Sequence, residues 1–117
     1  MEKLDQILAE PGLDGVIIGP HDLSISLGLP EQYHDPQFED AVGQIIAGSR
    51  KKGLSVGIHL SGEAQLQIKW AKAGANIIMH SSDLALFQQR LKEDIKAIRC
   101  ALKDDEGTIG KGKDTII

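Results

Sequence analysis

The chain has 117 residues and a formal net charge of −4, from 13 Lys and Arg against 17 Asp and Glu residues. This balance excludes the basic surface by which nucleic-acid-binding proteins hold phosphates. No apolar run approaches the roughly 20 residues that a membrane span needs, and the single cysteine, Cys100, excludes an internal disulfide. We therefore expect one cytoplasmic domain with neither nucleic-acid nor membrane partners.

The first half of the chain predicts a helix, a strand, a long connection and a second helix. Residues 2–10 have a helical pattern that ends at Pro11 and Gly12. The unbroken aliphatic run 16–18 is typical of a strand that is buried on both faces. After a connection over residues 19–34, Asp35 as N-cap and Pro36 as first helical residue begin a helix that runs to about Gly53.

The second half repeats the same alternation of strand and helix. Residues 54–60 and 75–81 predict two more buried strands, and a helix that Ser61 can cap separates them. The last helix begins near Ser82 and Asp83, and its apolar residues recur every three or four positions: Leu84, Phe87, Leu91, Ile95, Ile98 and Leu102. The order α-β-α-β-α-β-α predicts a parallel sheet built from βαβ units. Residues 1–103 form this domain, and residues 104–117 predict a disordered tail.

Polar and ionisable residues follow all three predicted strands. His21 and Asp22 follow the first strand, His59 closes the second, and His80 closes the third. Because ligands bind at the carboxyl ends of the strands in parallel α/β folds, this rim is the candidate site. Other roles stay open: Asp22, Ser82 and Asp83 as helix caps, His59 and His80 as hydrogen-bonded rim residues, and the three histidines together as a zinc site.

The long connection after the first strand carries the most specific chemistry. Gly19 allows a close approach of the backbone to a ligand, and the N–H groups of His21 and Asp22 can point towards an anion. The Asp22 carboxylate offers an oxygen ligand to a hard divalent metal. One carboxylate alone is an incomplete magnesium or manganese site.

Several segments together resemble the HpcH/HpaI-type class II aldolases. They are "LDGVIIGPHDLSISLGLPEQYHDPQFEDAV", "GLSVGIHLSG", "GANIIMHSSDLALF" and "LKEDIKAI", which together span about residues 2–100. The resemblance implies a (β/α)8 barrel, of which this chain supplies strands six, seven and eight. It implies cleavage of 2-keto-4-hydroxy or 2-keto-3-deoxy acids to pyruvate and an aldehyde, with a divalent metal (Mg, Mn or Co) that stabilises the pyruvate enolate. It also implies assembly as a homo-oligomer.

The same resemblance assigns roles to six residues. The aspartate of the Gly-Pro-X-Asp-Leu-Ser element binds the metal, a role that falls on Asp22. Backbone around the X position holds the pyruvate carboxylate, which falls on Gly19, Pro20 and His21. The segment after the next strand lines the pocket, which falls on His59 and Leu60.

The family's other site residues have no counterpart in this sequence. They are a second metal-binding glutamate after strand five, a histidine–aspartate pair that acts as base, and an arginine that stabilises the enolate. We therefore expect no catalytic residue in this chain, and expect it to be the C-terminal part of an aldolase that pairs with a complementary barrel half. Two alternatives stay open: a non-catalytic half-barrel module that acts by association, and a small three-layer domain that binds an anionic ligand.

Overall fold

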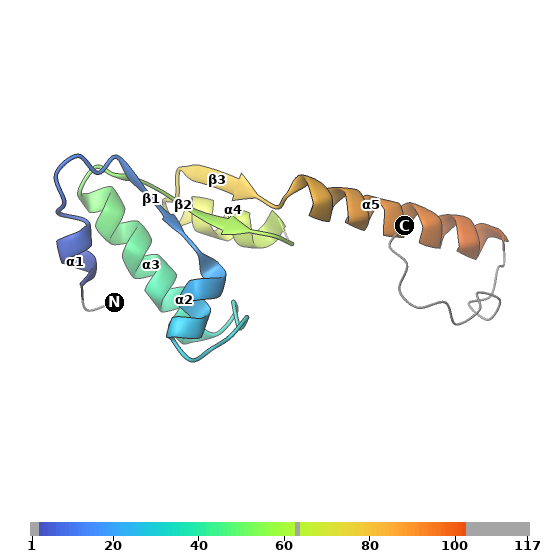
Figure 1. Ribbon diagram of the computed structural model, residues 1–117, viewed down its shortest axis with the longest axis horizontal. Coiled ribbons are helices and arrows are strands. Elements are labelled where there is room, and N and C mark those ends of the chain that lie inside the picture. Colours follow the sequence, from blue (N-terminus) through green and yellow to red (C-terminus); the bar gives the residue numbers. More distant parts are fainter. Residues whose placement is uncertain (1–2, 63, 103–117) are drawn as a thin grey trace. The chain divides into compact units, whose positions relative to one another are not determined.

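The computed structural model describes residues 3–62 and 64–102 of the chain. These fall into two units, residues 1–81 and residues 82–117, which are taken separately below. The first unit contains a parallel sheet of three strands, β1 (Gly15–Ile18), β2 (Ser55–Leu60) and β3 (Ile77–His80), which lie side by side in the order β1-β2-β3 (Figure 1). The predicted strands and their parallel direction are therefore confirmed, and within the described residues β1 and β3 each have one unpaired edge.

Two helices cover one face of this sheet. α3 (Pro36–Lys51) connects β1 to β2, and α4 (Ala64–Lys72) connects β2 to β3. Strand residues at alternate positions meet them in the buried core, which consists of Ile18, Val56, Ile58, Leu60, Phe38, Val42, Ile45, Ile46, Trp70 and Ala75. Both crossovers lie on the same side and the strands follow chain order, which is the arrangement of a (β/α) barrel rather than of a doubly wound sheet.

The predicted caps of α3 are confirmed. The Asp35 carboxylate accepts a hydrogen bond from the Gln37 backbone N–H at 2.8 Å, and Pro36 occupies the first turn, where its missing N–H costs nothing. α1 is shorter than predicted and spans only Leu4–Ile7. It lies close to α3, since a Cβ built on Gly48 would be 3.1 Å from a Leu8 methyl carbon.

The connection over residues 19–34 is partly helical, which differs from the prediction. α2 (Pro20–Ser26) begins directly after β1, so the element order has one helix more than expected. Asp22 is not the N-cap of this helix, because Gly19 occupies that position and Asp22 lies in the first turn. Leu23 and its C-cap Leu27, four residues apart, pack against the core, and so does Leu29 in the connection after the helix.

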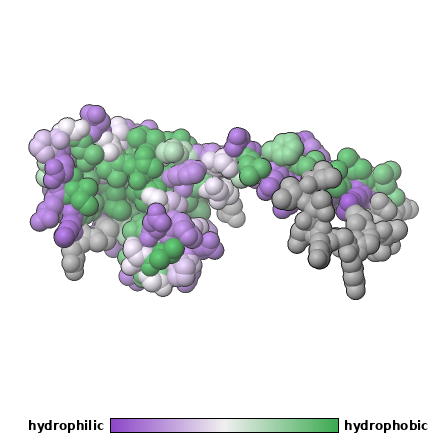
Figure 2. All heavy atoms as spheres, in the orientation of Figure 1, coloured by the Kyte–Doolittle hydropathy of each residue, from purple (hydrophilic) through white to green (hydrophobic). Residues whose placement is uncertain are grey.

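The prediction that the strands are buried on both faces is wrong for the first unit. On the face opposite α3 and α4, Ile17 is 45% exposed and Met79 is 40% exposed. Figure 2 shows apolar side chains gathered over the sheet of this unit. The prediction failed because the uncovered face carries the apolar side chains of Ile17 and Met79, so the strands lack the polar alternation that is typical of a sheet with one face in solvent.

The second unit contains one helix in its described part, α5 (Asp83–Leu102). The predicted cap is confirmed for Ser82, whose Oγ accepts from the Ala85 N–H at 3.2 Å. Asp83 is the first helical residue and not the cap, and its carboxylate accepts from the Leu84 N–H at 2.7 Å. The predicted tail, residues 104–117, lies outside the described residues. No helix in the described ranges combines the length and the apolar character needed to cross a membrane.

Candidate functional site

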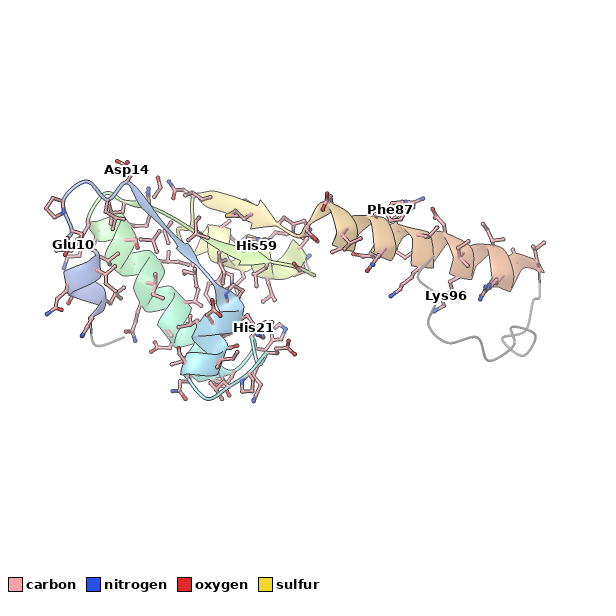
Figure 3. The ribbon with its side chains drawn as sticks, viewed as in Figure 1. Glu10, Asp14, His21, His59, Phe87 and Lys96 are labelled. Atoms are coloured by element: carbon pink, nitrogen blue, oxygen red, sulfur yellow. The ribbon has the colours of Figure 1, made fainter. Side chains whose placement is uncertain are left out.

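An open cleft of about 600 Å³ lies at the carboxyl ends of the strands in the first unit. All six residues that the resemblance singled out line this cleft, together with five others. Figure 3 shows two of them, His21 at the start of α2 and His59 on β2. The lining residues are Ile17, Ile18, Gly19, Pro20, His21, Asp22, Tyr33, His59, Leu60, Ser61 and Met79.

Asp22 is exposed at the mouth of the cleft. A Cβ built on Gly19 would be 3.5 Å from Asp22 Oδ2, so the carboxylate lies beside the Gly19 backbone. The first turn of α2 has no side-chain cap, and its first backbone bond is from the Leu23 N–H to the Gly19 carbonyl. The N–H groups of His21 and Asp22 precede that bond, so the helix supplies no acceptor for them and they remain donors for a ligand.

Ser24, which was not among the predicted site residues, fixes the segment that carries these groups. Its buried hydroxyl donates to the His21 carbonyl at 2.8 Å and accepts from the Glu31 N–H at 3.1 Å. Glu31 has a left-handed backbone with φ 60°, and its carboxylate lies 3.8 Å from His21 Nδ1. α2 is thereby joined to the end of its own connection, which limits the movement of the first turn.

His59 is held by a backbone carbonyl of the neighbouring strand connection. Its Nε2 lies 2.9 Å from the Ser81 carbonyl oxygen, and because a carbonyl only accepts, this nitrogen carries the proton. Ser81 has a left-handed backbone with φ 59°, and its N–H donates to the Leu60 carbonyl at 2.8 Å. The prediction of a hydrogen-bonded rim residue is confirmed for His59.

The three-histidine zinc site is not formed. In the sheet register Leu60 is beside His80, so His80 lies on the face of the helices whereas His59 lies on the opposite face. Among residues 3–62 and 64–102, no three His, Cys, Asp or Glu side chains are grouped to hold a metal. Asp22 offers a carboxylate oxygen of the kind that hard cations prefer, and it is one ligand of the several they need.

The remaining wall of the cleft is mostly apolar. Ile17 and Met79 come from the open face of the sheet, and Tyr33 comes from the end of the connection. Burial and, to a smaller extent, the nearby Glu31 carboxylate raise the pKa of Tyr33 above its ordinary value. The sequence signal for Ile17 was its alternation with the buried Ile18 along β1, which a fully aliphatic run conceals. Met79 shares this face because it lies beside His59 in the sheet register.

The family model for "HpcH/HpaI aldolase/citrate lyase" matches residues 1–89. The chain belongs to this family. A family relative, the 2-keto-3-deoxy-L-rhamnonate aldolase of Klebsiella pneumoniae, is 37% identical over 91 residues, which are 78% of this chain and 34% of the relative. The 5-keto-4-deoxy-D-glucarate aldolase of Escherichia fergusonii is 32% identical over 101 residues, which are 82% of this chain and 38% of that enzyme.

A solved family structure supports the fold. The HpcH/HpaI aldolase of Desulfitobacterium hafniense superposes with a TM-score of 0.78 and 28% identity, over 92% of this chain and 40% of that protein. The prediction of a partial (β/α)8 barrel is confirmed. The chain spans little more than a third of the length of the curated relatives named above.

Proposed function

We propose that this chain supplies the C-terminal part of a divalent-metal-dependent aldolase site that cleaves 2-keto-3-deoxy or 2-keto-4-hydroxy acids to pyruvate and an aldehyde. The observation that carries the proposal is the mouth of the cleft, where the Asp22 carboxylate and the unbonded N–H groups of His21 and Asp22 lie within one turn of helix. A carboxylate and free amide donors in one place match a metal and an anionic substrate at the same time.

In this proposal the residues of the chain bind and orient the substrate. Asp22 would hold the metal, which would act as a Lewis acid on the keto group. The His21 N–H, reached past Gly19 and Pro20, would donate a hydrogen bond to the substrate carboxylate. Ile17 and Met79 would exclude water from the carbon chain, and His59 and Leu60 would line the end that leaves as the aldehyde. Proton transfer would come from residues that the relatives carry outside the part matched here.

The names of the relatives support the substrate class. The enzymes of Klebsiella pneumoniae and Escherichia fergusonii are named for a 2-keto-3-deoxy acid and for a 5-keto-4-deoxy acid. We propose that the cleft lined by residues between 17 and 79 binds acids of this class. We also propose that residues 1–103 function together as one part of the aldolase. Homo-oligomeric assembly in the cytoplasm is part of the same proposal.

A complementation assay tests this function. The chain is co-expressed with a fragment of the Klebsiella pneumoniae relative that carries the rest of its barrel, and pyruvate release from 2-keto-3-deoxy-L-rhamnonate is followed with lactate dehydrogenase. We expect activity that EDTA removes and Mn²⁺, Mg²⁺ or Co²⁺ restores. Asp22→Ala should abolish this activity, because metal polarisation lowers the barrier by several kcal/mol.

Two control variants make the assay specific. Asp14→Ala removes an exposed carboxylate from the connection that enters β1, and His80→Ala removes a rim residue that does not line the cleft. Both should retain most of the activity. A stable complex in which Asp22→Ala is as active as the parent would show that Asp22 does not bind the metal.

A second candidate function is a non-catalytic half-barrel module that acts by pairing with another chain. The exposed apolar face of the sheet and its two open edges favour it, since unpaired strand edges are templates for association. Complex formation in the same co-expression, without pyruvate release under any metal, would support this alternative over the aldolase.

A further inference from the structure

His59 is an ionisable side chain on an otherwise apolar wall of the cleft. In the sheet register it lies beside Met79, and extension of the β1–β2 register by one residue brings it beside Gly19. Side chains paired across parallel strands point to the same face, so His59 shares the open face with Ile17 and Met79. Its ring therefore lies on the same level of the sheet as the backbone that leads to Asp22.

The hydrogen bond to Ser81 determines which ring nitrogen is the acceptor. Nε2 donates to the Ser81 carbonyl, so in the neutral ring Nδ1 carries the lone pair. Within residues 3–62 and 64–102, Nδ1 of His59 has no hydrogen-bond partner. The ring thus offers the cleft one acceptor.

The backbone of Ser81 supports this orientation. A serine with φ 59° is strained, and such residues persist where the surrounding structure holds them. Here the Ser81 N–H is bonded to Leu60, the residue after His59, and the Ser81 carbonyl is bonded to the His59 ring. Both bonds connect β2 to the turn after β3, and together they fix the ring and its tautomer.

The chemistry of a 2-keto acid identifies what this acceptor would bind. The carboxylate and keto oxygens of such an acid only accept hydrogen bonds, so neither can pair with an unprotonated Nδ1. The hydroxyl groups farther along the carbon chain are the donors that the ligand has. An acceptor on an apolar wall therefore favours a hydroxylated acid over its deoxy analogue.

We propose that His59 Nδ1 accepts a hydrogen bond from a hydroxyl group of the bound 2-keto acid and makes His59 a specificity-determining residue of this cleft. This inference rests on the proposed function, because it takes the ligand to be a 2-keto acid. It adds a requirement that Asp22 and the α2 amides do not impose, namely a hydroxyl on the part of the acid beyond the keto group.

Two NMR measurements on the full chain test the proposal. Long-range imidazole ¹H–¹⁵N spectra, with His59 assigned by its loss in His59→Asn, report the tautomer without any ligand. Titrations in Mg²⁺ then compare 2-keto-3-deoxy-L-rhamnonate with 2-oxohexanoate, which has the same carbon chain without the C4 and C5 hydroxyls. We expect an unprotonated Nδ1 and tighter binding of the hydroxylated acid, by about 2- to 12-fold for one hydrogen bond.

Two substitutions separate the acceptor from the structural bond. His59→Asn places a carbonyl oxygen near the position of Nδ1, whereas His59→Gln keeps an N–H that can reach Ser81 and offers no acceptor at Nδ1. The preference for the hydroxylated acid should persist in His59→Asn and disappear in His59→Gln. A purely structural role predicts the reverse order.

Three outcomes would overturn the inference. They are a protonated Nδ1, equal affinity of the parent chain for both acids, and a preference that survives His59→Gln. Equal affinities that both fall in Asp22→Ala would reject the role of His59 while leaving the proposed metal site intact. Absence of binding of either acid would reject the role of His59, whereas the proposed function is judged separately by pyruvate release in the complementation assay.

Discussion

The side-chain amide of Gln67 donates a hydrogen bond to the Met79 carbonyl at 2.6 Å and a second one to the Ile58 carbonyl at 3.2 Å. One buried residue of α4 therefore connects β2 and β3 next to the cleft. Its Oε1 atom is also buried and has no partner among the described residues, so the amide is oriented by its two donor bonds alone.

We expect Gln67→Met to lower the free energy of unfolding by about 1–3 kcal/mol, because two strand carbonyls lose a buried donor. Urea denaturation followed by circular dichroism measures the change. Gln65→Met is the matched control, since Gln65 is exposed on the same helix and should change stability by less than about 0.5 kcal/mol. Equal effects of the two substitutions would show that the buried amide does not stabilise the strand ends.

We expect a Gly→Ala substitution to change stability in opposite directions at two positions. A Cβ on Gly57 would overlap the Ile77 carbonyl oxygen and lie 2.8 Å from Ile77 Cβ, so Gly57→Ala should destabilise the sheet by about 1–3 kcal/mol or more. Gly43 lies within α3 with no atom within 4 Å of the corresponding position, so Gly43→Ala should stabilise the chain by about 0.5–1 kcal/mol. Thermal unfolding of both variants beside the parent checks the signs.

We expect the chain by itself to bind Mg²⁺ and Mn²⁺ more weakly than micromolar. Asp22 supplies one carboxylate to the cleft, and these cations need several oxygen ligands. Isothermal calorimetry with the parent and Asp22→Ala tests this. Micromolar affinity that Asp22→Ala removes would mean a more complete site than the described residues show, and micromolar affinity that survives it would place the ligands elsewhere.

Tyr33 is the single tyrosine of the chain, so its titration can be followed directly by the ultraviolet absorbance of the phenolate. Because burial and the Glu31 carboxylate raise its pKa, ionisation should occur at higher pH in the folded than in the unfolded chain. The unfolded state then loses its proton first, so folding stability should fall as the pH rises above about 10. In Glu31→Gln the folded titration should move part of the way back, and an unchanged curve would exclude the charge contribution.

We expect the chain to associate as its concentration rises. Ile17 and Met79 are exposed on the open face of the sheet, and β1 and β3 have unpaired edges in the first unit. Light scattering over a range of concentrations measures this, and Ile17→Lys should reduce it. Ile7→Lys is the control, because Ile7 is exposed on α1 away from the sheet. A monomer at every concentration would argue against association through this face.

The strands and caps were predictable because their signals are local. Apolar runs after helix-ending glycines locate β1, β2 and β3, and Asp35-Pro36 locates the start of α3. A helix after β1 was left open, with Asp22 as its cap, because the seven residues of α2 carry too short a pattern to distinguish from a loop. The sheet was wrongly predicted to be buried on both faces, because the exposed face carries aliphatic residues as well and the strands therefore show no polar alternation.

The sequence predicted which residues lie at the carboxyl ends of the strands, but not the hydrogen bonds that hold them in place. Chain order after each strand brought His21, Asp22 and His59 to one cleft, as the structure has them. His59 is paired with Met79 in the sheet, and His80 is the next residue along β3, so the side chains of His59 and His80 lie on opposite faces. The hypothesis of a three-histidine site did not take this alternation into account. The role of Ser24 depends on the N–H of the left-handed Glu31, and the role of Ser81 depends on its own left-handed backbone and on the contact of its carbonyl with His59. The sequence has no local signature for either.

The sheet order β1-β2-β3 repeats the order of the chain, so each strand pairs only with its neighbours in sequence. If such a fold is divided between two consecutive βα units, the only strand pairing that is lost is the one across the division. All pairings within each of the two parts are kept. The Asp22 carboxylate and the two amides beside it all lie within a single turn of α2, directly after β1. Recombination of genes at a unit boundary would therefore transfer the carboxylate and both amides together, and with them the whole of the metal and substrate contacts that we propose for α2.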